Sequence, residues 1–73
     1  MTEGVMTYEY DRDAWVVEIN GYQYTLFCGE SFELIVGQRN IPSRLELGEN
    51  WYIVMEGNVP FDLRISNVYH IYI

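Results

Sequence analysis

The sequence predicts an all-β fold, either a small antiparallel curled sheet or an SH3-like barrel built from hairpins. Short runs that alternate apolar and polar side chains fill almost the whole chain, and Asp, Asn, Gly, Ser or Pro separates each run from the next. No window repeats apolar residues at helical spacing as clearly as it alternates them with polar ones, and a single Ala with no Lys leaves few good helix formers. We expect residues 1–73 to form one small acidic domain.

The first predicted strand, Val5–Tyr10, alternates large apolar residues with polar ones. Met6, Tyr8 and Tyr10 share one parity, so they are expected to face inward. The strand leads into Asp11-Arg12-Asp13, which has neither the spacing nor the glycine of a calcium loop and is expected to form a turn with a local ion pair.

The next two strands, Ala14–Ile19 and Tyr22–Phe27, form the clearest hairpin in the sequence. Asn20-Gly21 between them is the strongest short-range signal for a type I′ turn, because both turn positions need positive φ. Pairing outward from the turn sorts the residues into an apolar face and a mixed face. The apolar pairs are Ile19 with Tyr22, Val17 with Tyr24 and Trp15 with Leu26; the mixed pairs are Glu18 with Gln23 and Val16 with Thr25.

Three further strands are expected at Phe32–Val36, Ile41–Leu47 and Trp51–Glu56. Gly48-Glu49-Asn50 joins the last two and suits a bulged hairpin loop. Pro42 has no amide hydrogen, so its strand is expected to lie at an edge or to start there. The expected inward set of this hairpin is Ile41, Leu45, Leu47, Trp51, Ile53 and Met55.

The last two predicted strands are Phe61–Ile65 and Val68–Ile73. The second of them is uncharged and aromatic, with no lysine or proline to protect an open edge. It must therefore pair within the domain, pair with another copy, or bind a partner.

The chain has few means of stabilisation other than its core. Cys28 is the only cysteine and His70 the only histidine, so an internal disulfide and a Cys/His zinc site are both excluded. Seven Tyr, two Trp and three Phe are expected to fill the core and interfaces, and a homodimer would add stability. No signal peptide or membrane span is visible, and one unpaired thiol favours the cytoplasm.

The charge balance excludes two classes of partner. Four Arg stand against eleven Asp and Glu, a formal net charge of -7. Arg12, Arg44 and Arg64 each have an acidic residue close in sequence, which leaves only Arg39 free. Phosphate backbones and anionic membranes need several positive contacts on one face, so direct binding to nucleic acid or membrane is not expected.

Four segments between Tyr22 and Ile65 carry a family resemblance: Leu26-Phe27-Cys28-Gly29-Glu30-Ser31-Phe32-Glu33-Leu34, Ile41-Pro42-Ser43-Arg44-Leu45-Glu46, Trp51-Tyr52-Ile53-Val54 and Leu63-Arg64-Ile65. In this order they resemble a family of small uncharacterised domains carried on phages and conjugative elements of Gram-positive bacteria. The resemblance implies a mobile-element accessory protein and assigns no catalytic role to any residue.

No catalytic, metal or cofactor site is predicted. Cys28 with His70 as its base could form a nucleophilic pair, but a small buried thiol beside the turn residue Gly29 is the expected role. Glu30 and Glu33 could act as paired carboxylates, although an acidic chain brings carboxylates together by chance. The six glycines stand singly, as turn residues, and form no phosphate-binding loop.

With apolar and aromatic groups assigned to the interior, the outer surface is expected to be mostly carboxylate. Glu9, Asp11 and Asp13 would point the same way, about 6.6 Å apart, if they lie on one extended stretch. The acids either keep the domain soluble or imitate nucleic-acid phosphates and dock into a basic groove of a host protein such as a defence nuclease. The residues predicted to bind the partner are Glu9, Asp11, Asp13, Glu46 and Glu49, with Tyr10 or Trp51 as an exposed aromatic anchor.

The function predicted from the sequence is therefore a non-enzymatic protein-binding module, an anti-defence inhibitor that blocks a basic nucleic-acid site. The alternative is a structural or assembly protein that pairs edge strands into a homo-oligomer, with the acidity serving only solubility.

Overall fold

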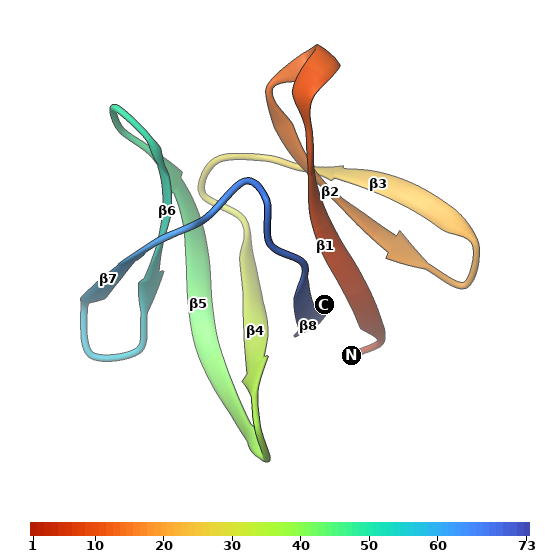
Figure 1. Cartoon of the computed structure of the whole chain (residues 1–73). Coiled ribbons are helices and arrows are strands. Elements are labelled where there is room, and N and C mark those ends of the chain that lie inside the picture. Colours follow the sequence, from red (N-terminus) through yellow and green to blue (C-terminus); the bar gives the residue numbers. More distant parts are fainter.

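The computed structural model describes all residues 1–73 as one antiparallel sheet with a single short 3-10 turn, η1 (Figure 1). The sheet has eight strands in the order β3-β2-β1-β8-β4-β5-β6-β7. The all-β prediction is confirmed in the form of the curled sheet, because β3 and β7 remain edges and the sheet does not close. The elements are β1 (Glu3–Glu9), η1 (Tyr10–Arg12), β2 (Ala14–Ile19), β3 (Tyr22–Leu26), β4 (Ser31–Val36), β5 (Arg39–Leu47), β6 (Trp51–Met55), β7 (Val59–Asp62) and β8 (Tyr69–Tyr72).

Both predicted hairpins form in the predicted register. Trp15 lies opposite Leu26 and Ile19 opposite Tyr22, and Asn20 and Gly21 take the positive φ values of 52° and 83° that a type I′ turn requires. In the second hairpin Leu47 lies opposite Trp51, so a three-residue loop connects β5 and β6. Local turn chemistry therefore determines the pairing of four of the strands.

The core lies on the concave side of the curl and draws on strands from both halves of the chain. Trp15 is fully buried, with its ring centroid 5.6 Å from that of Tyr8 and 5.7 Å from that of Tyr69. Leu47, expected inward, is 48% exposed near the end of its strand. The buried cluster consists of Met6, Trp15, Val17, Leu26, Phe32, Leu34, Leu45, Ile53, Leu63 and Ile71.

The expectation that the interior uses up the aromatic side chains is wrong. Tyr22 is 69% and Tyr24 56% exposed, although both share the apolar parity of their hairpin. They lie on an edge strand of an unclosed sheet, so no further strand covers them. Tyr10 and Phe27 are exposed in turns, and Phe61 is exposed on the other edge strand. The surface therefore offers aromatic rings as well as carboxylates.

Pro42 also departs from its prediction. It lies inside β5, which begins at Arg39 and runs between β4 and β6. The carbonyl oxygen of Pro42 accepts the amide of Glu56 at 2.8 Å, and Glu56 directly follows the end of β6. Because the N and O atoms of a strand residue face the same neighbour, the missing amide falls at the last rung of the β5–β6 ladder and leaves the β4–β5 ladder intact.

The seventh strand is Val59–Asp62 and not the predicted Phe61–Ile65. A turn with positive φ at Gly57 and Asn58 sets Met55 opposite Val59, which starts the strand early. As an edge strand, β7 tolerates Pro60. The C-terminal strand β8 is the reverse case, because it pairs with both β1 and β4 and its edges are covered within the domain.

Gly4 is not the turn residue predicted for it but lies buried inside β1. A Cβ atom there would lie 2.7 Å from Cγ1 of Val17, 2.9 Å from Cγ1 of Ile19 and 3.1 Å from the backbone oxygen of Glu18. The side chains of Val17 and Ile19 therefore pack directly over the backbone of Gly4 and leave no room for a larger residue.

We expect Gly4→Ala to lower the free energy of unfolding by about 1–3 kcal/mol, the usual effect of overpacking. Gly48→Ala is the matched control, since a Cβ atom there meets only Cε1 of Tyr52 at an ordinary 3.5 Å. Thermal unfolding followed by circular dichroism would compare the two. Equal midpoints would contradict the close approach at Gly4.

Candidate protein-binding cleft

Three segments that are distant in sequence meet at one end of the sheet: the η1 turn, the β5–β6 loop and the connection from β7 to β8. Figure 1 shows the η1 turn and the β5–β6 loop at the same end of the molecule. Between them lies an acidic cleft of about 390 Å³. Its lining consists of the carboxylates Asp13, Glu49 and Asp62, the rings of Tyr8 and Trp51, and Leu47, Asn50, Leu63 and Ile65.

Asp13 joins the two sides of this cleft. It follows η1 with a φ of 47°, and its amide donates to the carbonyl of Tyr10 at 3.3 Å. Its Oδ1 accepts hydrogen bonds from the hydroxyl of Tyr8 and, at 3.0 Å, from Nε1 of Trp51, which is 38 positions away. Oδ2 accepts no hydrogen bond from the chain, so one oxygen of the carboxylate remains free to bind.

The hydrogen bonds around Asp13 keep it charged. The Tyr8 hydroxyl, and then the Trp51 indole, lower the pKa of Asp13 below its ordinary value. The same hydrogen bond, with burial and the charge of Asp13 as smaller causes, raises the pKa of Tyr8. The cleft therefore keeps a carboxylate anion and a neutral phenol side by side over the whole physiological pH range.

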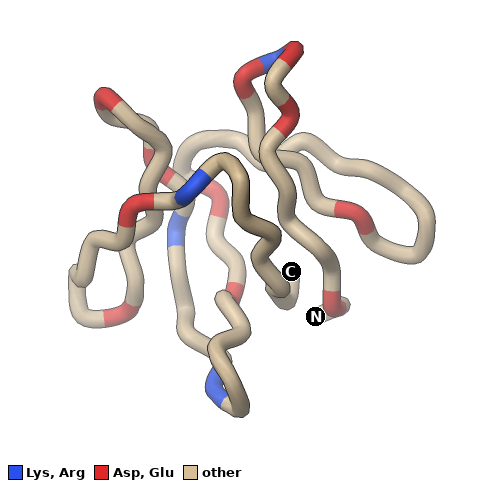
Figure 2. The backbone as a smooth tube through the Cα atoms, viewed as in Figure 1, with Lys and Arg blue, Asp and Glu red and all other residues tan.

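No Arg lines the cleft. Arg12 turns away from it and donates two hydrogen bonds to Glu9, at 2.5 and 3.0 Å, which lowers the pKa of Glu9. A third bond from Arg12, to Thr25 at 3.3 Å, holds the guanidinium against β3. Arg64 forms no ion pair and lies in the chain between the lining residues Leu63 and Ile65. Figure 2 shows acidic residues on the η1 turn, at the β5–β6 loop and at the end of β7.

The structure brings together three of the residues predicted for the site, Asp13, Glu49 and Trp51. Tyr10 is 67% exposed, not inward as its parity predicted, and its ring packs edge-on against Tyr8 with centroids 5.0 Å apart. Tyr10 is therefore adjacent to the cleft.

Asp11, Glu9 and Glu46 are not lining residues. The predicted extended line of Glu9, Asp11 and Asp13 is wrong because η1 begins at Tyr10 and breaks the two-residue period. Glu46 accepts hydrogen bonds from Arg44 and from the thiol of Cys28, and these lower its pKa.

Tyr8 and Asp62 are site residues that the sequence patterns do not predict. Tyr8 was assigned to the core, and it is half-buried with its hydroxyl turned to Asp13. Asp62 lies at the end of β7, and nothing in the sequence around it sets it apart from the other acids. The signal that could have found Tyr8 is the tyrosine hydroxyl itself, since a ring near the core needs a polar partner at its tip.

Cys28 is exposed, so its prediction as a small buried thiol is wrong. It occupies a turn in which Glu30 donates its amide to the carbonyl of Phe27 at 3.1 Å and Gly29 has a φ of 92°. The Cys28 thiol donates to Glu46 at 3.3 Å and not to His70, which is exposed on β8 opposite Val5.

The structure contains no helix with the length and apolar character that a membrane-spanning helix requires.

The fold and the cleft define a small all-β domain with an acidic, aromatic-lined cleft at one end of an open sheet. The chain belongs to the family described as a domain of unknown function (DUF5348), whose model matches residues 4–73. Among solved structures it is similar to the crystal structure of a protein from Ruminococcus gnavus determined by a structural genomics consortium. The identity is 25%, the TM-score is 0.76, and the match covers 97% of this chain and 99% of the other. A comparison with curated proteins finds no match.

Asp13→Asn is expected to flatten the acid side of the stability profile. Because the pKa of Asp13 is lower in the folded chain, ionisation of this group stabilises the fold at any pH above its ordinary pKa of 3.8. That stabilisation is lost as the pH falls from 3.8 through the lower folded-state pKa. Urea unfolding between neutral pH and about pH 2 should show a smaller loss in the variant. Glu49→Gln, which removes another carboxylate of the cleft, should keep the wild-type profile; equal flattening would contradict the role of the hydrogen bonds.

Proposed function

We propose that this chain is a non-enzymatic protein-binding module whose acidic end docks into the basic nucleic-acid-binding groove of a host protein. The observation that carries the proposal is the composition of the cleft, in which three carboxylates and two aromatic rings gather without any Arg or Lys. A cation entering such a site meets opposite charges at its rim and a ring face at its wall.

Arginine fits this site better than lysine. A guanidinium group is planar, stacks on the face of an indole and forms paired hydrogen bonds with a carboxylate. Trp51 is half-buried with its nitrogen tied to Asp13, so its ring is held in place before a partner arrives. Oδ2 of Asp13 is the acceptor that this arrangement leaves unused.

The cleft alone is smaller than a stable protein interface, because nine residues line it and such an interface uses about 20–30 residues on each partner. The exposed η1 turn extends the acidic surface with Asp11, and Tyr10 adds an exposed ring beside the cleft. Aromatic side chains are enriched at interfaces and dominate their energetics. We assign Tyr10 the role of the anchor outside the cleft.

The proposed setting follows from the family resemblance to domains of phages and conjugative elements. A mobile element that enters a bacterial cytoplasm meets nucleases whose grooves are lined with Arg and Lys for phosphate binding. A carboxylate surface with the complementary potential competes with nucleic acid for such a groove. The module would thereby act as an anti-defence inhibitor.

Salt-dependent capture tests this function. The protein, immobilised through an added tag, is exposed to host lysate, and the bound proteins are eluted by a salt step and identified by mass spectrometry. The purified partner is then titrated at low and high ionic strength. We expect the affinity to fall about tenfold or more, because exposed charges are screened within about 10 Å at 0.1 M salt. An affinity unchanged by salt would rule out electrostatic docking.

One observation favours the alternative function, assembly into a homo-oligomer. The C-terminal strand pairs within the domain, which is the first of the three outcomes predicted for it, but β3 forms an edge without Arg, Lys, Asp, Glu or Pro. Such edges pair with other strands. Sedimentation velocity at increasing protein concentration tests this function, and a single monomeric species throughout would exclude it.

A further inference from the structure

β3 (Tyr22–Leu26) is an open edge that the structure does little to protect. It pairs only with β2 and has no charged residue, proline or bulge of its own, and its one charged contact is the bond from Arg12 to the Thr25 hydroxyl at 3.3 Å. The other edge strand, β7, is shorter and contains both Pro60 and Asp62, which are common protections against strand pairing. The two edges of the same sheet therefore differ in their capacity to accept another strand.

The backbone of β3 shows which of its groups are free. Immediately after β3, the amide of Phe27 leaves the ladder and donates to Oε2 of Glu30 at 2.9 Å. Strand residues two apart point their backbone groups the same way, so Thr25 and Gln23 also face away from β2. Their amide and carbonyl groups are free to pair with an added strand.

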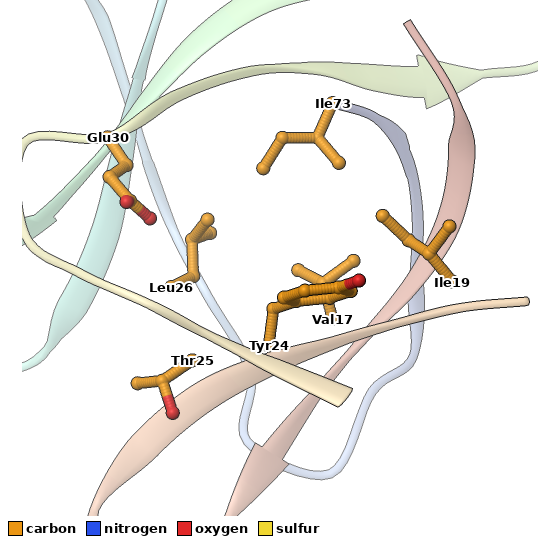
Figure 3. Close-up of a pocket in the computed structure, with 7 residues that line it drawn as sticks. All are labelled: Val17, Ile19, Tyr24, Thr25, Leu26, Glu30 and Ile73. Carbon is orange, nitrogen blue, oxygen red and sulfur yellow. The ribbon is translucent and has the colours of Figure 1, made fainter. Parts of the chain in front are cut away.

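A groove of about 310 Å³ runs along the concave side of this edge. Figure 3 shows Ile73 and Glu30 across the groove from Tyr24, with Ile19 and Val17 beside the tyrosine ring and Leu26 between. Five of the seven lining side chains are apolar or aromatic, and the other two are the hydroxyl-bearing Thr25 and a carboxylate, Glu30, toward one end. Side chains of a strand paired with β3 would alternate into this groove and out to solvent.

We infer that the β3 edge and its groove bind an extended segment of a partner protein by strand addition. The segment has apolar residues at alternate positions and an Arg or Lys in phase with them that reaches Glu30. Main-chain hydrogen bonds would supply the affinity, and the groove would select the side chains. This surface is separate from the acidic cleft, with which it shares no lining residue.

Charge selects a partner protein over a second copy of this chain. The edge strands of a second copy are β3 and β7, and neither contains an Arg or Lys to meet Glu30. A second copy would also bring a further formal charge of -7. A basic segment of another protein satisfies both requirements.

A capped synthetic peptide, Arg-Thr-Val-Thr-Val-Thr-Val, is the probe, titrated into isotope-labelled protein and followed by NMR. We expect slowed amide exchange at Gln23 and Thr25 with unchanged exchange in β7. Two N-methylated isomers of the peptide, each blocking alternate amides, sharpen the test. One isomer should lose binding and the other keep it, because only one set of amides faces β3.

Glu30→Gln should weaken the peptide about fivefold, while Glu56→Gln, which removes an equal charge from the β6–β7 turn, should leave the affinity unchanged. Changes centred on Asp13 and Trp51, equal binding of both isomers, or no binding would overturn the inference. Protection of Gln23 and Thr25 without peptide, together with a dimer in sedimentation, would also overturn it in favour of self-pairing. Neutralising the acidic cleft should not affect this peptide, so the inference and the proposed function fail separately.

Discussion

Replacing Trp15 with alanine is expected to remove a large part of the stability of the fold. Trp15 has no exposed surface, and it packs against the ring of Tyr8 on β1 and the ring of Tyr69 on β8. Truncation of a buried Trp costs about 3–5 kcal/mol. A chain of 73 residues has a total stability of about 4–11 kcal/mol, so this one change removes much of it.

Urea unfolding followed by circular dichroism, with one-dimensional NMR to register dispersion, measures this effect. Tyr22→Ala is the matched control, because it also removes an aromatic ring from the hairpin but at a position that is 69% exposed. The control should change stability by less than about 1 kcal/mol. Equal losses in both variants would contradict the central place of Trp15 in the core.

The second large effect is expected in binding. The triple variant Asp13→Asn, Glu49→Gln and Asp62→Asn removes the three carboxylates of the acidic cleft without changing side-chain size. At up to about 1 kcal/mol for each exposed charge, affinity for the captured partner should fall about 100-fold. Isothermal titration calorimetry measures the affinity, and circular dichroism verifies that the variant is folded.

A second triple variant separates position from total charge. Glu3→Gln, Glu18→Gln and Glu56→Gln remove the same formal charge from exposed positions outside the cleft. We expect this variant to bind within about threefold of wild type, because those residues do not line the cleft and salt screens exposed charges that a partner does not contact directly. Equal weakening by the two variants would mean that the acidity acts through net charge and that the cleft is not the docking site.

Local patterns predicted those parts of the fold that turns and alternation determine. Asn20-Gly21 specified a turn, the turn specified the register of β2 and β3, and Trp15 and Val17 were therefore placed correctly in the core. Features that depend on contacts between distant segments were harder to predict from the sequence. Pro42 is tolerated inside β5 because β6 ends opposite it, and Gly4 is buried because side chains of β2 pack over it. Neither feature can be predicted from the residues next to Pro42 or Gly4 in the sequence.

For the candidate site, too, the sequence predicted the local features and not the long-range ones. Composition predicted an acidic surface, and Asp13, Glu49 and Trp51 were named for it. That Asp13 and Trp51 share a hydrogen bond across 38 positions follows only from the curl of the sheet. The alternation of inward and outward side chains stops at the η1 turn, because three residues of 3-10 geometry interrupt the two-residue period of the strand. Tyr10 is therefore exposed and not inward, and Asp11 does not lie in one line with Glu9 and Asp13.

The two tryptophans occupy different environments, and this gives the protein two built-in optical reporters. The indole of Trp15 is sealed from water, whereas that of Trp51 is partly exposed beside carboxylates. A soluble quencher should therefore reach the emission of Trp51 and not that of Trp15 while the chain is folded. A partner seated in the cleft would shield the second emitter, so that unfolding and docking could be followed separately by fluorescence without any label.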